Sequence, residues 1–289
     1  MTEASDPSLV TIGIATKNRW EDLKNTLSKI EEFGRGRLKV LIFDDASEIA
    51  CPFDVGSICR GAELKRFSES EGYIVRRNQL AREMCSKYYL SLDDDSFPHS
   101  GSLEAALEFA QSCEDMLCLS FPIYNPIVEA HQLKSLDNRP YRVRSFVGCS
   151  HLLHRERFLA LGGYCEDLVH FWEETELAAR GFQRGLYCYH FPGLLIHHLE
   201  SNAGRNRHRM DFYGARNNVL WNDWFMPSGL RLVKQSRSFV SRLLLVITTR
   251  RVGHLQGQIA GMIDVSRYKA KRSPMPPELY KEWKSLPSS

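Results

Sequence analysis

Continuous apolar runs alternate with amphipathic stretches along most of this chain. Residues 9–16 (LVTIGIAT) are rich in β-branched side chains, and the stretch WEDLKNTLSKIEEF that follows has apolar residues at positions 20, 23, 27 and 30. That spacing is typical of a helix with one buried face. The runs LKVLIFDDAS and KYYLSLDDDS are also apolar strands that end in polar residues, and the helical stretch IVRRNQLAREMCSKY lies between them. Strands separated by helices predict βαβ units and a parallel sheet buried on both faces.

The pattern continues less regularly after residue 100. We expect residues 129–144 to form an irregular excursion. The other elements are expected to be a helix (GSLEAALEFAQSC), a strand and loop (MLCLSFPIYNPIV), a strand and helix that stop at two glycines (FVGCSHLLHRERFLALGGY), a helix ended by Gly185 (FWEETELAARGFQRG), and two strands broken by Pro192 (LYCYHFPGLLIHH). We therefore expect one Rossmann-like α/β domain over residues 1–227, with a mostly parallel central sheet and helices on both faces.

Residues 228–272 differ from the rest of the chain in charge. They hold ten Lys or Arg against one acid, a net charge of +9, whereas the whole chain has +3 and the remainder therefore −6. On a helical wheel over residues 230–247 the basic residues fall within one arc and the apolar residues crowd the other side. The segment is thus predicted to be a basic amphipathic helical extension, followed by a Pro-rich tail at residues 273–289. Such a helix can lie in an anionic membrane interface, or pack on the domain with its basic face in water, and the sequence leaves both open.

Composition narrows the class of protein. The 43% hydrophobic and 25% charged content over 289 residues is typical of a soluble globular protein and excludes disordered and fibrous classes. The longest apolar run near a helical region, residues 243–247, is far too short to span a bilayer. Eight cysteines without a C-x-x-C pair, and an acidic start (MTEASDPSLV), favour reduced thiols in a cytoplasmic protein, with peripheral attachment at the inner face of the membrane as the open alternative. Nucleic acid is not an expected partner, because the basic residues lack interleaved aromatic side chains.

Acidic residues gather where the predicted strands end. Asp44 and Asp45 follow one strand, Asp93, Asp94 and Asp95 follow another, and residues 16–19 (TKNR) follow the first. Ligands of open α/β sheets bind outside the carboxyl ends of the strands, so these side chains are expected to share one rim. Adjacent carboxylates repel one another unless they are neutralised, and a hard divalent cation binds one or two carboxylates of this kind. A solvated acidic turn, or a cap for the helix that begins near residue 101, is the alternative.

Five stretches taken together resemble a known family. TIGIATKNR, VLIFDDAS, GYIVRRNQLAREMCSKYYLSLDDDS, GGYCEDLVHFWEETELAARGFQRG and HFPGLLIHH, in this order over roughly residues 8–225, resemble the inverting glycosyltransferases of family 2, which have the GT-A fold. The resemblance implies a nucleotide-diphosphate sugar as donor and a divalent cation, Mn²⁺ or Mg²⁺, as cofactor. It also implies transfer to a hydroxyl of a glycan, lipid-linked or small-molecule acceptor, as in polysaccharide or glycoconjugate biosynthesis.

The resemblance assigns roles to the residues at the strand ends. Thr16 and Arg19 would line the nucleotide pocket. Asp45 would accept a hydrogen bond from the base, and Asp44 would hold the loop. Arg77 and Asn78 match an Arg-Asn pair of the family and would also bind the donor. Asp93 would face the ribose or the metal, and Asp94, which stands between the two predicted metal ligands, is a further donor-binding residue. Asp95, together with Asp93, would ligate the metal.

The catalytic pair shows a departure from the family pattern. The usual Glu-Asp falls on Glu173 and Glu174, so the second carboxylate is one methylene farther from the backbone while its base strength is kept. Glu174 is the predicted general base, with Glu173 beside it. His197 and His198 match a terminal histidine that serves in some members as a metal ligand. Successive residues of a strand face opposite sides, so at most one of them can point into the site.

Two basic residues after the last strand suit a diphosphate, and two other functions are alternatives to sugar transfer. Arg205 and Arg207, which follow the last strand, are predicted to contact the diphosphate, since arginine suits phosphate oxygens. A sugar-phosphate nucleotidyltransferase would also have acids at strand ends, but it needs a Gly-rich phosphate loop, and ATKNRWED contains no glycine. A non-catalytic nucleotide-sugar-binding protein is the third alternative. The retained acidic residues argue against it.

Overall fold

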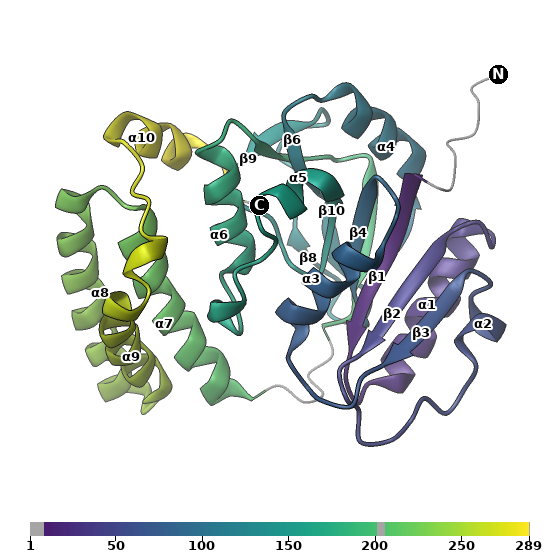
Figure 1. Ribbon diagram of the computed structural model, residues 1–289, viewed down its shortest axis with the longest axis horizontal. Coiled ribbons are helices and arrows are strands. Elements are labelled where there is room, and N and C mark those ends of the chain that lie inside the picture. Colours follow the sequence, from purple (N-terminus) through teal and green to yellow (C-terminus); the bar gives the residue numbers. More distant parts are fainter. Residues whose placement is uncertain (1–8, 201–205, 289) are drawn as a thin grey trace.

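The computed structural model describes residues 9–200 and 206–288 and has an α/β architecture (Figure 1). Its strands are β1 Val10–Thr16, β2 Lys39–Asp44, β3 Ala62–Arg66, β4 Tyr88–Asp93, β5 Ser96–Gly101, β6 Met116–Ser120, β7 Ile123–Asn125, β8 Ala130–Leu133, β9 Tyr141–Val143, β10 Ser150–His154, β11 Tyr187–His190 and β12 Leu194–His198. Within the described residues, eight of them form one sheet in the order β3-β2-β1-β4-β10-β6-β11-β9, and four form a second sheet in the order β5-β12-β7-β8.

Ten α-helices lie within the described residues, and several of them cover the two faces of the large sheet. They are α1 Trp20–Gly34, α2 Val55–Ile58, α3 Tyr73–Glu83, α4 Leu103–Ser112, α5 Arg155–Ala160, α6 Glu173–Phe182, α7 Arg207–Phe225, α8 Ser228–Thr249, α9 Gly253–Arg267 and α10 Pro277–Ser285, with short 3-10 helices at Glu166–Leu168 and Lys269–Lys271. Apolar residues of α1 and α4 pack on one face, and those of α3, α5, α6 and α7 pack on the other. Strands buried on both faces explain the continuous apolar runs, and the predicted α/β fold class is confirmed.

The acidic strand ends meet at one edge of the sheet. β1 pairs in parallel with both β2 and β4, with Thr16 opposite Asp44 and Ala15 opposite Asp93. Parallel strands in this register end at the same level, so the residues that follow them come together. The expected common rim is therefore present.

Several short elements were missed from the sequence. Residues 129–144, which we expected to be irregular, contain β8 and β9, and the strands β3 and β5 had not been predicted. β3 has the sequence AELKR and lies at the edge of the large sheet, whereas β8 (AHQL) lies at the edge of the small one. Polar edge strands are held by hydrogen bonds to one neighbour and show little apolar alternation.

The segment predicted as a Pro-rich tail contains a docked helix. Met275 and Trp283 are buried, and the latter lies on α10. The amide of Ser273 donates to the carbonyl oxygen of Trp224 at 2.9 Å, and the amide of Met275 donates to that of Phe225 at 2.9 Å. Pro277 at the start of α10 suits a first helical turn, where the missing N–H has no partner to lose. These residues complete the core beside α7.

Three glycines let α9 lie directly on α7. Gly253, Gly257 and Gly261 are buried and recur every fourth residue, which places them on one face of α9. A Cβ on Gly261 would lie 2.7 Å from the carbonyl oxygen of Arg216, and one on Gly257 would overlap the carbonyl oxygen of Phe212. The backbone of α9 therefore lies against the backbone of α7.

Gly257→Ala is expected to lower the free energy of unfolding by about 1–3 kcal/mol, because a methyl group at this seam forces two helix backbones apart. Chemical denaturation measures the change. Gly229→Ala is the matched control, since this α8 glycine has nothing within 4 Å of an added Cβ. That variant should be neutral, or more stable by up to ~1 kcal/mol through helix propensity. Equal losses of unfolding free energy in both variants would contradict the close backbone contact between α7 and α9.

Two basic residues of α8 contact neighbouring helices, whereas Lys234 and Arg237 are exposed. Arg231 forms an ion pair with Asp223 of α7, and the Arg242 guanidinium donates to the side-chain oxygen of Gln258 on α9 at 2.8 Å. The partly buried side of α8 thus combines these polar contacts with the half-buried Phe239 and Leu245, and both alternatives for this helix stay predictions. Among the helices that the structure describes, none has the length and apolarity to cross a membrane.

Candidate functional site

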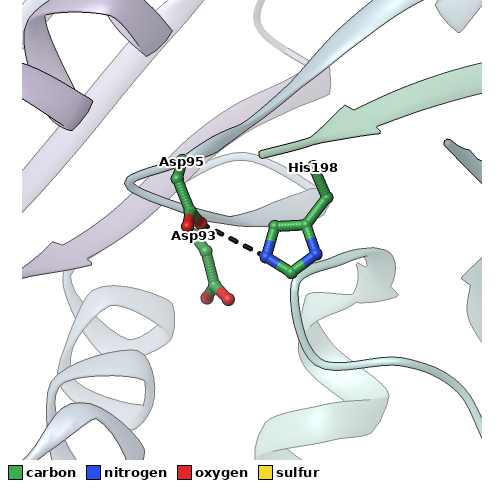
Figure 2. A group of neighbouring side chains, drawn as sticks. All are labelled: Asp93, Asp95 and His198. Atoms are coloured by element: carbon green, nitrogen blue, oxygen red, sulfur yellow. Dashed lines mark ion pairs between the residues drawn. The ribbon is translucent and has the colours of Figure 1, made fainter. Parts of the chain in front are cut away.

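The turn between β4 and β5 carries the three aspartates. The amide of Asp93 donates to the Ser96 hydroxyl at 2.9 Å, which closes the turn. β5 pairs antiparallel with β12, and this register puts His198 opposite Ser96. As a result the His198 Nε2 atom lies 3.3 Å from Asp95 Oδ1, and Figure 2 shows the two side chains turned toward each other with Asp93 beside them. We call Asp93, Asp94 and Asp95 the acidic corner.

Basic side chains offset the repulsion within the acidic corner. Arg19 contacts Asp94 Oδ1 at 2.9 Å and Asp95 Oδ2 at 2.7 Å. The Thr16 hydroxyl donates to Asp94 Oδ2 at 2.7 Å. Thr16 and Arg19 therefore lie at the corner itself, at the end of the first strand, as the sequence pattern predicted.

Burial and these partners shift the pKa values of the corner in different directions. Burial raises the pKa of Asp94 to about 7. Burial also acts to raise the pKa of Asp95, but His198 and Arg19 outweigh it and hold that pKa below its usual range. For His198 burial lowers the pKa, yet the hydrogen bond to Asp95 prevails and raises it to about 11. The corner is thus built to keep Asp95 ionised.

The donor atoms of this corner fit a divalent cation. One ligand atom each from Asp93, Asp95 and His198 lie within 4.8 Å of one another, and no other group of three such residues does so in the part of the chain that the structure describes. Two carboxylates and one imidazole suit Mn²⁺, and the remaining positions of an octahedral shell are left for water or phosphate oxygens. The side-chain oxygen of Gln132 lies 2.8 Å from His198 Nδ1. Because an amide oxygen only accepts, it holds the proton on Nδ1 and leaves Nε2 directed to the corner.

The structure also chooses between the two adjacent histidines. His197 faces the other side of β12 and stacks on His99, with 3.6 Å between ring centroids. Burial, then the charge of His99, lowers the pKa of His197 to about 4. The sequence left open which of the two histidines would meet a metal, and His198 is the one that lies beside Asp93 and Asp95.

A single buried guanidinium joins the acidic corner to the acidic pair. Arg77 Nη2 lies 2.5 Å from Asp93 Oδ1 and 2.9 Å from the carbonyl oxygen of Gly148. Its Nη1 atom lies 3.5 Å from Glu173 Oε1. The two acidic clusters, 80 residues apart in sequence by their numbering, are thus on either side of one side chain.

Glu173 and Glu174 form the first turn of α6. Burial raises the pKa of Glu174 well above its ordinary value, and the neighbouring charge of Glu173 adds to the shift. Burial also raises the pKa of Glu173, while Arg77 opposes the rise. Glu174 Oε1 lies against the Cα of Gly148, where a Cβ would overlap it. A half-buried carboxylate with a raised pKa is a stronger base than a solvated one once it is ionised.

The turn before α6 is strained and held by α7. Val169, Phe171 and Trp172 have positive φ angles of 64°, 67° and 75°, which are unfavourable for these residue types. The buried Asn217 side chain on α7 donates to the carbonyl oxygens of residues 168, 170 and 171 at 2.8–3.0 Å. The Trp172 indole donates to the carbonyl of Gly214 at 3.1 Å, so this ring is tied to α7. Sequence reasoning missed Asn217, because an asparagine within a helix carries no periodic signal.

The carboxylates at the end of β2 bind their own loops. Asp45 accepts hydrogen bonds from the Ser70 hydroxyl, the amides of residues 71 and 72 and the Arg76 guanidinium, at 2.6–3.0 Å. Asp44 accepts from the amide and hydroxyl of Ser47, which agrees with the expected loop-holding role. A cavity of about 430 Å³ lies beside them, lined by residues 46–47 and 66–68. Asp45 contacts with a nucleotide base remain a prediction, and both of its oxygens already have partners.

Asn78 lies away from the acidic corner. Its side chain donates to the Tyr164 carbonyl at 3.0 Å and accepts from the Tyr164 amide at 2.8 Å, which fixes the loop after Gly162 and Gly163. This buried side chain is thus bonded to the loop, and its contact with a donor stays a prediction. A larger cavity of about 850 Å³ beside this loop reaches Lys271 and is lined by no residue that we had assigned to the site.

Of the two predicted diphosphate-binding arginines, Arg205 lies outside the described residues. Arg207 is the first residue of α7 and is exposed. Its contact with a diphosphate stays a prediction.

Comparisons with known proteins agree with this geometry. A family model described as Glycosyl transferase family 2 matches residues 11–162, which is more than half of the chain. No curated protein matches significantly. Solved structures share the fold at low identity. GalNAc-T7 with UDP, GalNAc and Mn²⁺ has a TM-score of 0.56 and 16% identity, covering 74% of this chain and 50% of its own, so the chain spans half the length of that protein.

Two further structures extend the similarity. The mannosyltransferase PcManGT from Pyrobaculum calidifontis, in complex with GDP-Man and Mn²⁺, has a TM-score of 0.56 and 16% identity and covers 98% of this chain and 81% of its own. S. aureus TarS has a TM-score of 0.50 and 12% identity, covering 73% of this chain and 43% of its own. These likenesses are of fold. The family match over residues 11–162 shows that the chain belongs to glycosyl transferase family 2, and its fold is of the GT-A type.

Proposed function

We propose that the protein is an inverting, divalent-cation-dependent glycosyltransferase that moves a sugar from a nucleotide-diphosphate sugar to an acceptor hydroxyl. The observation that carries the proposal is the buried Arg77, which contacts Asp93 of the acidic corner and Glu173 of the acidic pair. An acidic corner that can bind a cation lies on one side of this guanidinium, and a carboxylate with a raised pKa lies on the other. A single displacement at the anomeric carbon requires both kinds of group.

The corner is assigned to the donor diphosphate. Asp93, Asp95 and His198 would hold Mn²⁺ or Mg²⁺. GalNAc-T7 and PcManGT, which share the fold, were solved with Mn²⁺ and with UDP or GDP-Man. A bound cation would stabilise the negative charge that grows on the departing diphosphate. The Arg19 guanidinium lies at the corner, beside Asp94 and Asp95, and would also bind the phosphates, since arginine suits phosphate oxygens.

Glu174 is assigned as the general base. A sugar hydroxyl is a weak nucleophile, so a carboxylate must accept its proton as the oxygen attacks the anomeric carbon. Glu173 is bound electrostatically to Arg77 and would fix the position of the pair. Attack from the Glu174 side and departure toward the acidic corner would occur on opposite faces of the anomeric carbon, which inverts its configuration.

The nucleotide is assigned to the cavity at the ends of β2 and β3. This cavity of about 430 Å³ offers the Phe67 ring and the Arg66 guanidinium, both at its lining. Asp44 and Asp45 would act by holding the loops around it, as their hydrogen bonds indicate. The acceptor would be a glycan, lipid-linked or small-molecule hydroxyl, with a role in polysaccharide or glycoconjugate biosynthesis.

A donor panel tests the proposal directly. Nucleotide sugars that differ in base and sugar are each mixed with the protein and Mn²⁺, and thermal unfolding and release of nucleoside diphosphate are followed. One donor should raise the unfolding temperature only when Mn²⁺ is present and release its nucleoside diphosphate when an acceptor is added. NMR of the product should show an inverted anomeric centre. A retained anomeric configuration, or the absence of any Mn²⁺-dependent stabilisation across the panel, would overturn it.

A further inference from the structure

α8 lies at the outer edge of the molecule (Figure 1). Seven of its large apolar side chains have exposed fractions of 41–70%, and they are Leu230, Leu232, Val233, Val240, Leu243, Leu244 and Ile247. The neighbouring α9 exposes Ile259, Met262 and Ile263 at 45–67%. Folded proteins rarely leave so much apolar surface in one region unless something binds to it. We call these ten side chains the apolar face of α8 and α9.

The fold does not use this face. An ordinary surface helix turns most of its apolar side inward, whereas α8 buries only Phe239 and Leu245 in part and turns Arg231 and Arg242 to Asp223 and Gln258. Both arginines are only partly exposed, as is the inward Gln235. The polar contacts fix the rotation of the helix about its axis and keep the apolar face directed away from the protein. A binding partner therefore finds the face already formed.

Positive charge accompanies the apolar face. Lys234, Arg237 and Arg250 are exposed along or just after α8. Residues 228–272 have ten basic residues and only Asp264 as an acid. That acid is already paired with Arg216 of α7 at 2.7 Å. A partner that covers this region must therefore offer apolar contact and negative charge together.

We infer that the apolar face of α8 and α9 docks into the surface of a membrane that contains anionic phospholipids. A bilayer interface accepts an amphipathic helix lying in its plane, with apolar side chains among the acyl chains and basic ones at the headgroups. A second copy of this chain fits less well, since a two-fold interface brings each patch against itself and would oppose like charges. The inference goes beyond sugar transfer and does not depend on it.

Vesicle flotation tests the inference with the full chain. The protein is mixed with vesicles of phosphatidylcholine alone, or with vesicles in which about a third of the lipid is the anionic phosphatidylglycerol. We expect flotation with the anionic vesicles at low salt and its loss as salt is raised. Leu244→Gln with Ile247→Gln should weaken binding by about tenfold or more. Arg237→Gln with Arg250→Gln should weaken it by roughly fivefold for each charge removed.

Matched control variants distinguish binding by this face from nonspecific binding by other exposed apolar residues. Ile49 and Leu136 are both 73% exposed and lie outside α8 and α9. Ile49→Gln with Leu136→Gln should float like the wild type. The inference is overturned if the wild type stays unbound to anionic vesicles at low salt, or if the control Ile49→Gln with Leu136→Gln weakens flotation as much as Leu244→Gln with Ile247→Gln. It is also overturned if light scattering shows a dimer that Leu244→Gln with Ile247→Gln dissolves, because the face would then belong to a second copy.

Discussion

Glu174→Gln is expected to lower the rate of sugar transfer by roughly 10²–10⁴-fold while leaving donor affinity unchanged. The amide keeps the size of the side chain and its place against Gly148 but cannot accept the proton of the acceptor hydroxyl. Stability should be kept or increased, because burial already disfavours the charged form of Glu174. A carboxyl group whose pKa is raised by folding destabilises the native state as the pH rises above its unfolded pKa, and the neutral amide removes that cost. Turnover, donor binding and chemical denaturation are measured on the same preparation.

Glu173→Gln is the matched comparison on the same helical turn. It removes the partner of Arg77 at 3.5 Å but leaves Glu174 in place, so a smaller loss of turnover is expected. If Glu173→Gln abolishes transfer while Glu174→Gln keeps it, the base has been assigned to the wrong member of the pair. Loss of donor binding in Glu174→Gln would argue instead that this residue contacts the donor.

Asp95→Asn is expected to abolish Mn²⁺ binding and lower transfer by about 10³-fold, which corresponds to a loss of ~4 kcal/mol of transition-state stabilisation. Asp95 lies beside Asp93 and His198 in the only group of three potential ligands that the described residues contain. Removing its charge leaves too few anionic ligands for a hard cation. Chelation of the wild type should reproduce the same loss. Mn²⁺ affinity is measured without donor by electron paramagnetic resonance, which reports on binding independently of turnover.

The two histidines of β12 supply the matched pair for this prediction. His198→Gln should weaken Mn²⁺ binding, because the imidazole lies 3.3 Å from Asp95. His197→Gln should leave Mn²⁺ affinity unchanged, since that ring stacks on His99 on the other side of the strand. Equal losses in both variants, or full Mn²⁺ affinity in Asp95→Asn, would contradict the assigned site.

The strand ends were predictable and the partners of their side chains were not. The apolar runs and the helix spacing located β1, β2 and β4, and with them the acids at their ends, because these signals are local. The hydrogen bonds of Asp45 and Asn78 to loops of their own chain were not predicted, and the donor contacts expected of these two residues stay predictions. Such hydrogen bonds join residues 26 and 86 positions apart, and no local pattern reports them.

The sequence by itself determined the α/β class, the order of the motifs, and the presence of a cation-type D-x-D and an acidic pair, since each follows from residue types and short-range spacing. Only the tertiary structure decided which histidine meets the acidic corner, because that depends on the antiparallel register of β12 on β5. It also decided that Arg77 links the two acidic clusters, that Asn217 holds the strained turn before α6, and that α8 turns its apolar face outward. Each of these depends on contacts between segments distant along the chain. Periodicity gives the faces of a helix, but the neighbours that the fold provides determine which face is buried.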